Sequence, residues 1–330
     1  MAFTGTAKAG YRATQTMREP RGLVTIQDFV RWGASRFNEA GLFFGHGTDN
    51  ALDEAAALVL FALQLDQALP AAYLSCRLTP PERDAVANLI ERRIRERKPL
   101  PYLTRHAVFA GYDFYIDEQV LVPRSPLAEV VERGFAPWAD PEATGRVLDL
   151  GTGSGCIGIA SALYLPQASV DLVDLSPSAL AVAERNVARY GLEGRVRVLE
   201  SDLFEAVAGR RYDVIVSNPP YVATDELSAL PSEYRAEPWL ALAGGETGLD
   251  VIVRILRGAH EHLSPGGVLV VECGNSADAL VSRFPRAPFT WLEFERGGDG
   301  VFLLTREELV DLVASWEQWT PDDPVGVAAG

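Results

Sequence analysis

The chain has 330 residues, of which 48% are hydrophobic and 23% charged, a composition typical of a globular protein with room for two domains. Its formal net charge of -15 argues against a nucleic-acid backbone as the main contact surface and favours basic partners. The scattered cysteines and histidines match no disulfide or metal-site spacing, and no apolar run is long enough to span a membrane. We therefore expect a cytoplasmic protein without a metal.

The N-terminal part of the chain predicts a small helical domain over residues 23–104. Residues 1–22 are polar and aperiodic and are expected to form a flexible tail. The first helix follows Val24, with Thr25 as its N-cap and Asp28 three residues later. Two more helices are predicted, one over residues 52–65 and one from Pro80. This domain could grip a macromolecular substrate, or it could be a packed bundle with solvated charge.

Residues 105–123 alternate like strands and predict a β-hairpin that links the helical domain to a second domain over residues 124–310. Residues 311–330 are acidic and contain proline and glycine, which predicts a loose C-terminal tail. The chain should therefore consist of two domains and a linker between two tails.

A glycine-rich turn opens the second domain. A strand from Arg146 runs into it, and a helix over residues 156–165 follows it. The glycines allow a ligand to approach the backbone, and the helix N-terminus favours a carboxylate or phosphate. The next strand ends in Asp174, about 20 residues beyond the last glycine, a spacing that suits the hydroxyls of a ribose. The pattern predicts a nucleotide-like cofactor at Gly151, Thr152, Gly153, Ser154 and Gly155.

Helices and strands alternate through the rest of this domain, which predicts an α/β fold with a mostly parallel sheet covered on both faces. Ligands of such sheets bind at the carboxyl ends of the strands, where the glycine turn, Asp174, Asp202 and Asn218 all lie. Helices are predicted over residues 177–190, 250–262 and 277–284, and strands over residues 195–200, 212–217, 267–272, 289–294 and 301–305.

The strand over residues 212–217 stops abruptly at Asn218-Pro219-Pro220-Tyr221. A residue before proline is held extended, so the Asn218 side-chain oxygen and the Pro219 carbonyl are free to accept two hydrogen bonds. Two converging acceptors suit a planar NH2 group, whose developing positive charge they would stabilise during nucleophilic attack. Tyr221 offers a flat face that could pack on such a group or near a sulfonium cation. A purely structural proline turn is the alternative interpretation.

Gly153, Gly155 and Gly158 also match the dinucleotide fingerprint Gly-x-Gly-x-x-Gly, which on its own is a weak signal. A nicotinamide-dependent enzyme would need partners for hydride transfer, and the sparse histidines offer no obvious set. The proline motif therefore favours group transfer to nitrogen over redox chemistry.

Asp149-Leu-Gly-Thr-Gly-Ser-Gly155, Asp174 and Asn218-Pro-Pro-Tyr221 together resemble the S-adenosylmethionine-dependent methyltransferases that modify the side-chain nitrogen of glutamine. The resemblance implies a Rossmann-like class I methyltransferase domain with a mostly parallel seven-stranded sheet. It implies S-adenosyl-L-methionine as methyl donor and S-adenosyl-L-homocysteine as product.

The same resemblance implies roles for individual residues. Asp149 and the glycine turn would surround the methionine part of the cofactor, Asp174 would bind the ribose, and Asp202 with Leu203 would lie beside the adenine. Many members of the family have tryptophan where Leu203 stands. The implied catalytic residues are Asn218, Pro219, Pro220 and Tyr221. Asn218 is also implied to contact the cofactor.

One branch of that family methylates peptide release factors and another methylates a ribosomal protein. The release-factor branch usually carries an Ile-Pro-Arg-Pro-Asp-Thr-Glu type segment where this chain has Val122-Pro-Arg-Ser-Pro-Leu-Ala-Glu129. Three further segments resemble the ribosomal branch, whose substrate is a glutamine of large-subunit ribosomal protein three. They are Gly45-His-Gly-Thr-Asp-Asn50, Tyr102-Leu-Thr104 and residues 290–302. The resemblance covers about residues 23–308.

The resemblance implies transfer of a methyl group to the amide nitrogen N5 of a glutamine in that ribosomal protein. Exposed ribosomal RNA would repel a chain of net charge -15, so we expect the free, basic ribosomal protein to be the better substrate, before or during ribosome assembly. Methylation of a release factor is an alternative. An adenine-N6 or guanine-N2 methyltransferase would present the same two N–H bonds to the same acceptors, but the acidic charge opposes it, and we expect no direct contact with nucleic acid. A catalytically silent assembly factor is the alternative from another class.

Overall fold

The computed structural model describes residues 22–316 and contains two compact units. The first contains the described residues up to Ala40 together with Ala51–Arg95, and the second contains Gly41–Asn50 and the described residues from Glu96 onward. The tail expected for residues 1–22 lies outside the described residues except for its last position, as does the part of the C-terminal tail beyond residue 316.

The first unit is built from the helices α1 (Ile26–Glu39), α2 (Ala51–Ala62) and most of α3 (Pro80–Glu96), with a 3₁₀ turn at Ala71–Ser75. The expected N-cap is confirmed: the amide of Asp28 donates to the Thr25 hydroxyl, and the Asp28 carboxylate accepts from the amide of Thr25. Its interior contains a buried ion pair, in which Arg93 Nε donates to Glu54 Oε1 over 2.5 Å.

Beyond the loop Gly41–Asn50, the second unit contains a short helix, α4 (Leu100–Thr104), and a two-stranded antiparallel sheet of β1 (Ala107–Phe109) and β2 (Tyr112–Phe114). The expected hairpin over residues 105–123 is therefore shorter than predicted. Residues 115–123 have no strand partner in the structure, although Ile116, Val120 and Val122 are buried in the core and the residues between them are half-buried or exposed.

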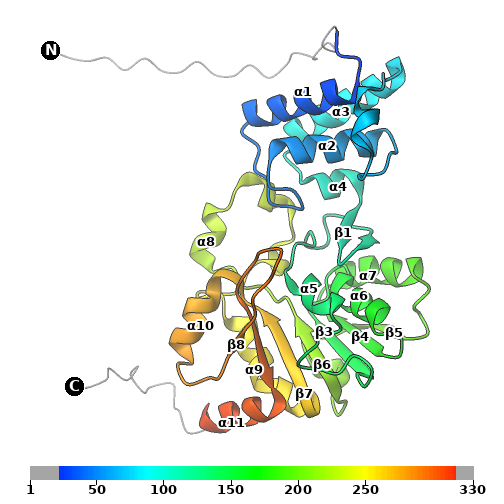
Figure 1. The fold of residues 1–330 in the computed structure, drawn as a ribbon. Helices are drawn as coiled ribbons and strands as arrows, with labels where there is room; N and C mark the ends of the chain where they lie inside the picture. The colour runs from blue at the N-terminus through cyan, green and yellow to red at the C-terminus, as the bar shows by residue number, and fades with distance from the viewer. Residues whose placement is uncertain (1–21, 317–330) are drawn as a thin grey trace, which may run out of the picture. The chain divides into compact units, whose positions relative to one another are not determined.

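Seven strands form the main sheet in the order β5-β4-β3-β6-β7-β9-β8, which confirms the mostly parallel α/β fold (Figure 1). The pairs among β5, β4, β3, β6 and β7 are parallel, whereas β9 pairs antiparallel with both β7 and β8. The strands are β3 (Arg146–Leu150), β4 (Ser169–Asp174), β5 (Val196–Glu200), β6 (Tyr212–Ser217), β7 (Leu263–Glu272), β8 (Thr290–Trp291) and β9 (Val301–Thr305).

Helices cover both faces of this sheet because its strands alternate their side chains between two apolar clusters. Val147 of β3 packs into the apolar cluster on one face of the sheet, and Leu148 and Leu150 pack into the cluster on the opposite face. The helices on the first face are α5 (Leu127–Glu132), α6 (Cys156–Tyr164) and α7 (Pro177–Arg189), and those on the second are α9 (Asp250–His262), α10 (Ala277–Arg283) and α11 (Arg306–Trp316).

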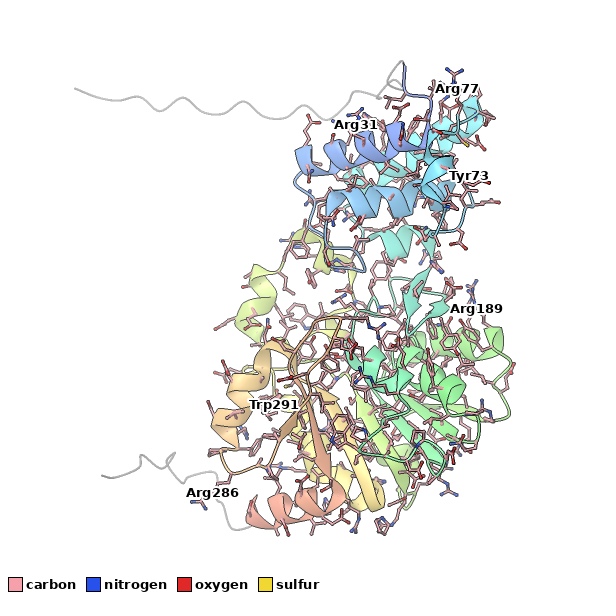
Figure 2. All side chains as sticks on the ribbon, in the orientation of Figure 1. Arg31, Tyr73, Arg77, Arg189, Arg286 and Trp291 are labelled. Atoms are coloured by element: carbon pink, nitrogen blue, oxygen red, sulfur yellow. The ribbon has the colours of Figure 1, made fainter. Side chains whose placement is uncertain are left out.

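The edge strand β8 has only two residues, although the sequence predicts a strand over residues 289–294. Trp291 remains 38% exposed there and contacts Phe302 of β9 edge-on, with 5.9 Å between ring centroids (Figure 2). An edge strand this short leaves few unpaired backbone groups exposed to other chains.

Helix α11 includes residues 311–316, which the sequence analysis assigned to a tail. Leu309 and Leu312 lie three residues apart and are both buried against the sheet, so this segment gains apolar packing that its acidic composition does not reveal. Between β6 and α9 the chain forms α8 (Thr224–Ala229) and two 3₁₀ turns at Ser232–Ala236 and Trp239–Ala241, which sequence reasoning did not predict.

Candidate active site

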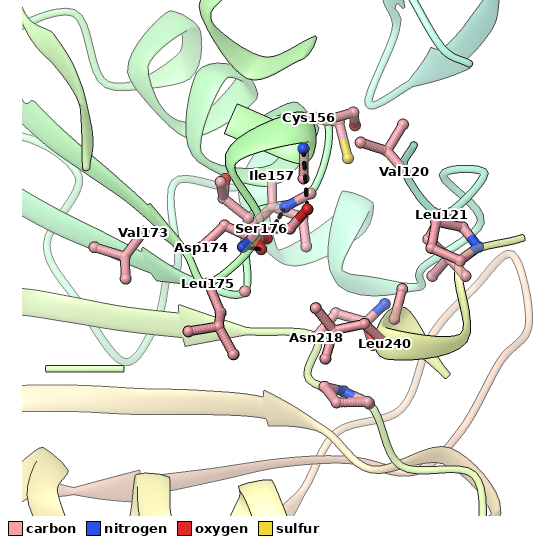
Figure 3. A pocket seen from close by; sticks show the side chains of 18 of the residues that line it. Val120, Leu121, Cys156, Ile157, Val173, Asp174, Leu175, Ser176, Asn218 and Leu240 are labelled. Carbon is pink, nitrogen blue, oxygen red and sulfur yellow. Dashed lines mark hydrogen bonds between the residues drawn. The ribbon is translucent and has the colours of Figure 1, made fainter. Parts of the chain in front are cut away.

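A cavity of about 180 Å³ lies in the second unit at the carboxyl ends of the parallel strands (Figure 3). Its walls come from segments far apart in the sequence, including the glycine turn, the ends of β4 and β6, and the 3₁₀ turn at Trp239–Ala241. Of the residues predicted from the sequence, the lining contains Gly151, Thr152, Gly153, Ser154, Asp174, Asp202, Leu203, Asn218 and Pro220.

Asp149 lies beneath the glycine turn and not in the cavity wall. Its side chain is fully buried, and Oδ2 accepts hydrogen bonds from the Thr152 hydroxyl over 2.5 Å and from the Gly158 amide over 2.9 Å. Burial raises the pKa of Asp149 to about 7, although both of these hydrogen bonds oppose the rise. In this structure Asp149 holds the turn to the first turn of α6.

The glycines of the turn have different environments. A Cβ atom added to Gly151 or Gly153 would have no neighbour within 4 Å, so their backbone is open to a ligand. At Gly155, also outside the lining, an added Cβ would lie 2.9 Å from Ile159, and at Gly158 it would lie 2.2 Å from Leu172. The third and fourth glycines therefore allow α6 to pack closely on the sheet.

Asp174 ends β4 at the rim of the cavity. Oδ2 accepts from the Gly153 amide over 2.8 Å, and Oδ1 accepts from the Ser176 amide over 2.9 Å. Burial raises the pKa of this carboxyl above its usual value, against the effect of these amides. Each carboxylate oxygen keeps a further lone pair, so the side chain can still accept hydrogen bonds from vicinal hydroxyls.

Asp202 and Leu203 follow β5 and line another part of the cavity. Arg254 of α9 pairs with Asp202 over 2.8 Å. Leu203 adopts a left-handed backbone conformation with φ of 52°, and its carbonyl accepts a hydrogen bond from the Ser201 hydroxyl. Leu203 therefore lines the cavity directly after the end of β5, and its contact with adenine stays a prediction.

Asn218 is half-buried in the cavity wall, and its side chain has no hydrogen-bond partner among residues 22–316. It follows Ser217, whose hydroxyl donates to the Leu150 carbonyl and fixes the end of β6 to β3. Pro220 lines the cavity as well, whereas Pro219 is buried outside the lining. The amide oxygen of Asn218 is therefore available to accept a hydrogen bond at the cavity wall.

Tyr221, which the sequence analysis expected to face the ligand, is outside the cavity lining. Its hydroxyl donates to Glu272 over 2.8 Å, and its carbonyl accepts from the Ser276 hydroxyl over 2.7 Å. Its ring lies so close to Gly274 that a Cβ there would lie 2.5 Å from it. All three contacts come from the end of β7 and the turn that follows, so Tyr221 anchors the proline motif to the sheet.

Several lining residues were missed by sequence reasoning, chiefly Arg124 and the turn at Trp239–Ala241. Arg124 donates two hydrogen bonds to Glu237, of 2.6 Å to Oε1 and 2.9 Å to Oε2. Burial disfavours the charge of Arg124, but the pairing with Glu237 outweighs it and raises the pKa of the guanidinium. The stiff Val122-Pro-Arg-Ser segment was the one available signal for Arg124.

Within residues 22–316, no group of three His, Cys, Asp or Glu side chains is placed to hold a metal ion. None of the described helices combines the length and apolar character needed to cross a membrane.

Comparison with known proteins finds close relatives over most of the chain. Residues 135–230 match the family model described as the methyltransferase small domain. A ribosomal protein uL3 glutamine methyltransferase of Xanthomonas campestris pv. campestris is 51% identical over 87% of this chain and 93% of its own length. One of Neisseria meningitidis serogroup A is also 51% identical, over 87% of this chain and 95% of its own length.

Solved structures resemble this chain more distantly. A 16S rRNA N2 methyltransferase of T. thermophilus, in complex with AdoMet and guanosine, is 20% identical over 61% of this chain and 49% of its own, with a TM-score of 0.41. That score is too low to support an inference about function.

Proposed function

The chain belongs to the ribosomal protein uL3 glutamine methyltransferases, and on that basis we propose that the cavity described above holds the methyl donor and the substrate glutamine. The enzyme transfers a methyl group to the side-chain amide nitrogen of a glutamine in uL3. S-adenosyl-L-methionine is the donor, and S-adenosyl-L-homocysteine is the product that leaves. The observation that carries the site assignment is that Asn218 and Asp174 line the same cavity, from the ends of β6 and β4.

The residues of the cavity fit the donor. Asp174 retains acceptor capacity for ribose hydroxyls, and the open backbone at Gly151 and Gly153 can approach the methionine part. Asp149 supports this turn from beneath and would contribute through Thr152 and Gly158 instead of by direct contact. S-adenosyl-L-methionine supplies an activated methyl group on a sulfonium ion, so the protein's task is positioning.

The amide of glutamine is a poor nucleophile because its nitrogen lone pair is delocalised into the carbonyl. The free side-chain oxygen of Asn218, which lines the cavity, would accept one of its N–H bonds, orient the nitrogen and stabilise the positive charge that develops on it. The Pro219 carbonyl is the proposed second acceptor, although Pro219 itself is buried outside the cavity lining. Pro220 completes the wall, and Tyr221 keeps the motif in place from behind through Glu272 and Ser276.

The net charge of -15 favours a basic protein substrate and opposes close approach to exposed ribosomal RNA. We expect free uL3, before or during ribosome assembly in the cytoplasm, to be a better substrate than the assembled subunit. The helical first unit is the candidate for substrate recognition. Methylation of a release factor is not favoured, because the relatives at 51% identity are named for uL3.

The proposal is tested with purified enzyme, labelled S-adenosyl-L-methionine and four acceptors: free uL3, assembled large subunits, a release factor and total RNA. We expect one methyl group on a glutamine of free uL3, located by peptide mass spectrometry. Transfer chiefly to RNA or to the release factor would contradict the substrate assignment, and equal rates on free and assembled uL3 at low salt would contradict the timing. Absence of any transfer would favour the silent assembly factor.

A further inference from the structure

The loop Gly41–Asn50 joins α1 to α2 in sequence but belongs to the second unit. It contains His46, which is 2% exposed. The imidazole lies against the Tyr234 ring, with 4.6 Å between centroids, and its Nε2 is 3.5 Å from Glu237 Oε2. The amide of Phe43 donates to Glu233 over 3.2 Å. The loop therefore contacts the segment that carries residues 233–237 at several points.

Glu237 connects this loop to the cavity. Glu237 is 5% exposed. Its carboxylate accepts hydrogen bonds from Nη1 and Nη2 of Arg124 and, over 3.1 Å, from the Val122 amide. Burial alone would raise the pKa of Glu237, but His46 and Arg124 outweigh it and lower that pKa to about 2. One buried carboxylate thus joins the loop to the Val122–Ser125 segment.

Both segments held by Glu237 form cavity wall. Pro123, Arg124 and Ser125 line the cavity from one of them, and Pro238, Leu240 and Ala241 line it from the residues directly after Glu237. Ser125 also donates a hydrogen bond to Glu272, which accepts the Tyr221 hydroxyl. The position of Glu237 therefore affects the shape of the cavity and the support of the proline motif.

His46 has no part of its own in the cavity lining. Its Nδ1 and Nε2 are both buried without a hydrogen-bond partner in the described part of the chain, and Nε2 lies 3.5 Å from Glu237 Oε2, within ion-pair distance. Burying an imidazole without hydrogen bonds costs folding free energy. Such a cost is expected at functional sites, which suggests that His46 is kept for its contact with Glu237.

We propose that His46 is a positioning residue for methyl transfer, which fixes Glu237 and through it the two cavity walls at Pro123–Ser125 and Pro238–Ala241. This inference rests on the proposed function for its place in catalysis, but not for its effect on the cavity. The Gly45-His46-Gly47 segment, which resembles the ribosomal branch, would thus position Glu237 within the second unit.

The test measures binding of S-adenosyl-L-homocysteine by calorimetry, which requires neither uL3 nor turnover, alongside thermal unfolding. His46→Leu keeps the volume but removes the polar contact, and Glu237→Gln keeps the shape but removes the charge. We expect each to weaken binding about tenfold, and the double variant to be no weaker than Glu237→Gln alone. His46→Gln, which retains a donor, should recover most of the affinity.

Tyr212→Phe is the matched control, because it removes a buried 2.6 Å hydrogen bond to Asp171 away from the cavity lining. It should lower thermal stability and leave the affinity unchanged. Unchanged affinity in folded His46→Leu would overturn the proposal, as would multiplicative losses in the double variant. If His46→Leu does not fold, unchanged affinity in Glu237→Gln overturns it instead.

Methyl transfer to uL3 is measured on the same variants. A wild-type protein that binds S-adenosyl-L-homocysteine but methylates no glutamine would refute the proposed function, while the binding data would still decide the role of His46. If both hold, the variants should lose kcat/KM for uL3 in proportion to the weakened binding.

Discussion

The Tyr221 hydroxyl and the buried Glu272 carboxylate are joined by a 2.8 Å hydrogen bond that fixes the proline motif to the end of β7. Burial raises the pKa of Glu272, although its two hydroxyl donors oppose the rise. The pairing indicates that Tyr221 acts by anchoring Asn218, and not by stacking on the substrate.

Tyr221→Phe distinguishes these two roles. The ring is kept, so a stacking role would leave turnover intact, whereas loss of the anchor should lower kcat by about 3- to 10-fold and stability by about 1–2 kcal/mol. Steady-state kinetics and urea unfolding measure both effects. Affinity for S-adenosyl-L-homocysteine should stay within about twofold of wild type, because Asp174 is untouched. Full activity would restore the stacking interpretation.

Asn218→Ala should lower kcat by about 10²- to 10³-fold, since it removes one acceptor that stabilises charge in the transition state. Binding of S-adenosyl-L-homocysteine should change little. Asn275→Ala, at an exposed amide outside the cavity lining, serves as the control for a generic loss of asparagine. Single-turnover transfer to uL3 is the measurement, and a kcat within threefold of wild type would refute the assigned role.

Asp174→Asn should weaken binding of S-adenosyl-L-homocysteine by about 10- to 100-fold. The carboxylate accepts from the amides of Gly153 and Ser176, and an asparagine NH2 group would have to face one of these donors. Calorimetry of the variant measures the effect, with the exposed Asp225→Asn as control. Equal affinities for both variants would show that the ribose does not depend on this position.

Gly158→Ala should destabilise the protein by about 1–3 kcal/mol through overpacking, because its Cβ would lie 2.2 Å from the Leu172 side chain and 3.1 Å from Asp149. Gly194→Ala is a matched substitution, since a Cβ there would have no neighbour within 4 Å. Chemical denaturation of both variants gives the comparison. Equal stabilities would mean that α6 shifts freely on the sheet.

Glu237 should make stability fall at low pH. Its pKa is lowered from 4.5 to about 2 in the folded protein, so its contribution is complete above about pH 4.5 and is lost as the pH falls towards 2. The stability difference between wild type and Glu237→Gln should therefore shrink as unfolding is measured from pH 7 to pH 3. The exposed Glu293→Gln should show only a small difference at any pH. A gap that widens in acid would contradict the sign.

Local signals in the sequence predicted the regular part of the second unit well. The apolar strand at 212–217, the glycine turn and the Thr25 cap all depend on neighbours a few residues away, and each is confirmed. Asn218 and Asp174 could be brought together in advance because parallel strands place their carboxyl ends on one edge.

Other features depend on partners distant in the sequence and could not be predicted. Glu237 follows a 3₁₀ turn that the sequence did not predict, and only the fold brings Arg124 to it from 113 residues away. The Asn-Pro-Pro-Tyr sequence does not reveal whether the Tyr221 ring faces a ligand or Gly274. Its orientation is set by the hydrogen bond to Glu272, which lies at the end of another strand. The C-terminal part of helix α11 was not predicted, because its acidic composition resembles that of a solvated tail although Leu309 and Leu312 are buried.

The membership of Gly41–Asn50 in the second unit means that the catalytic half is not one contiguous piece of chain. A truncated protein starting at residue 96 would lose His46, and Glu237 would keep its arginine but lack the imidazole. In a chimaera that takes its helical unit from a relative, residues 41–50 should therefore come from the protein that supplies the catalytic unit. A single crossover point near residue 96 would separate the insert from the carboxylate it contacts.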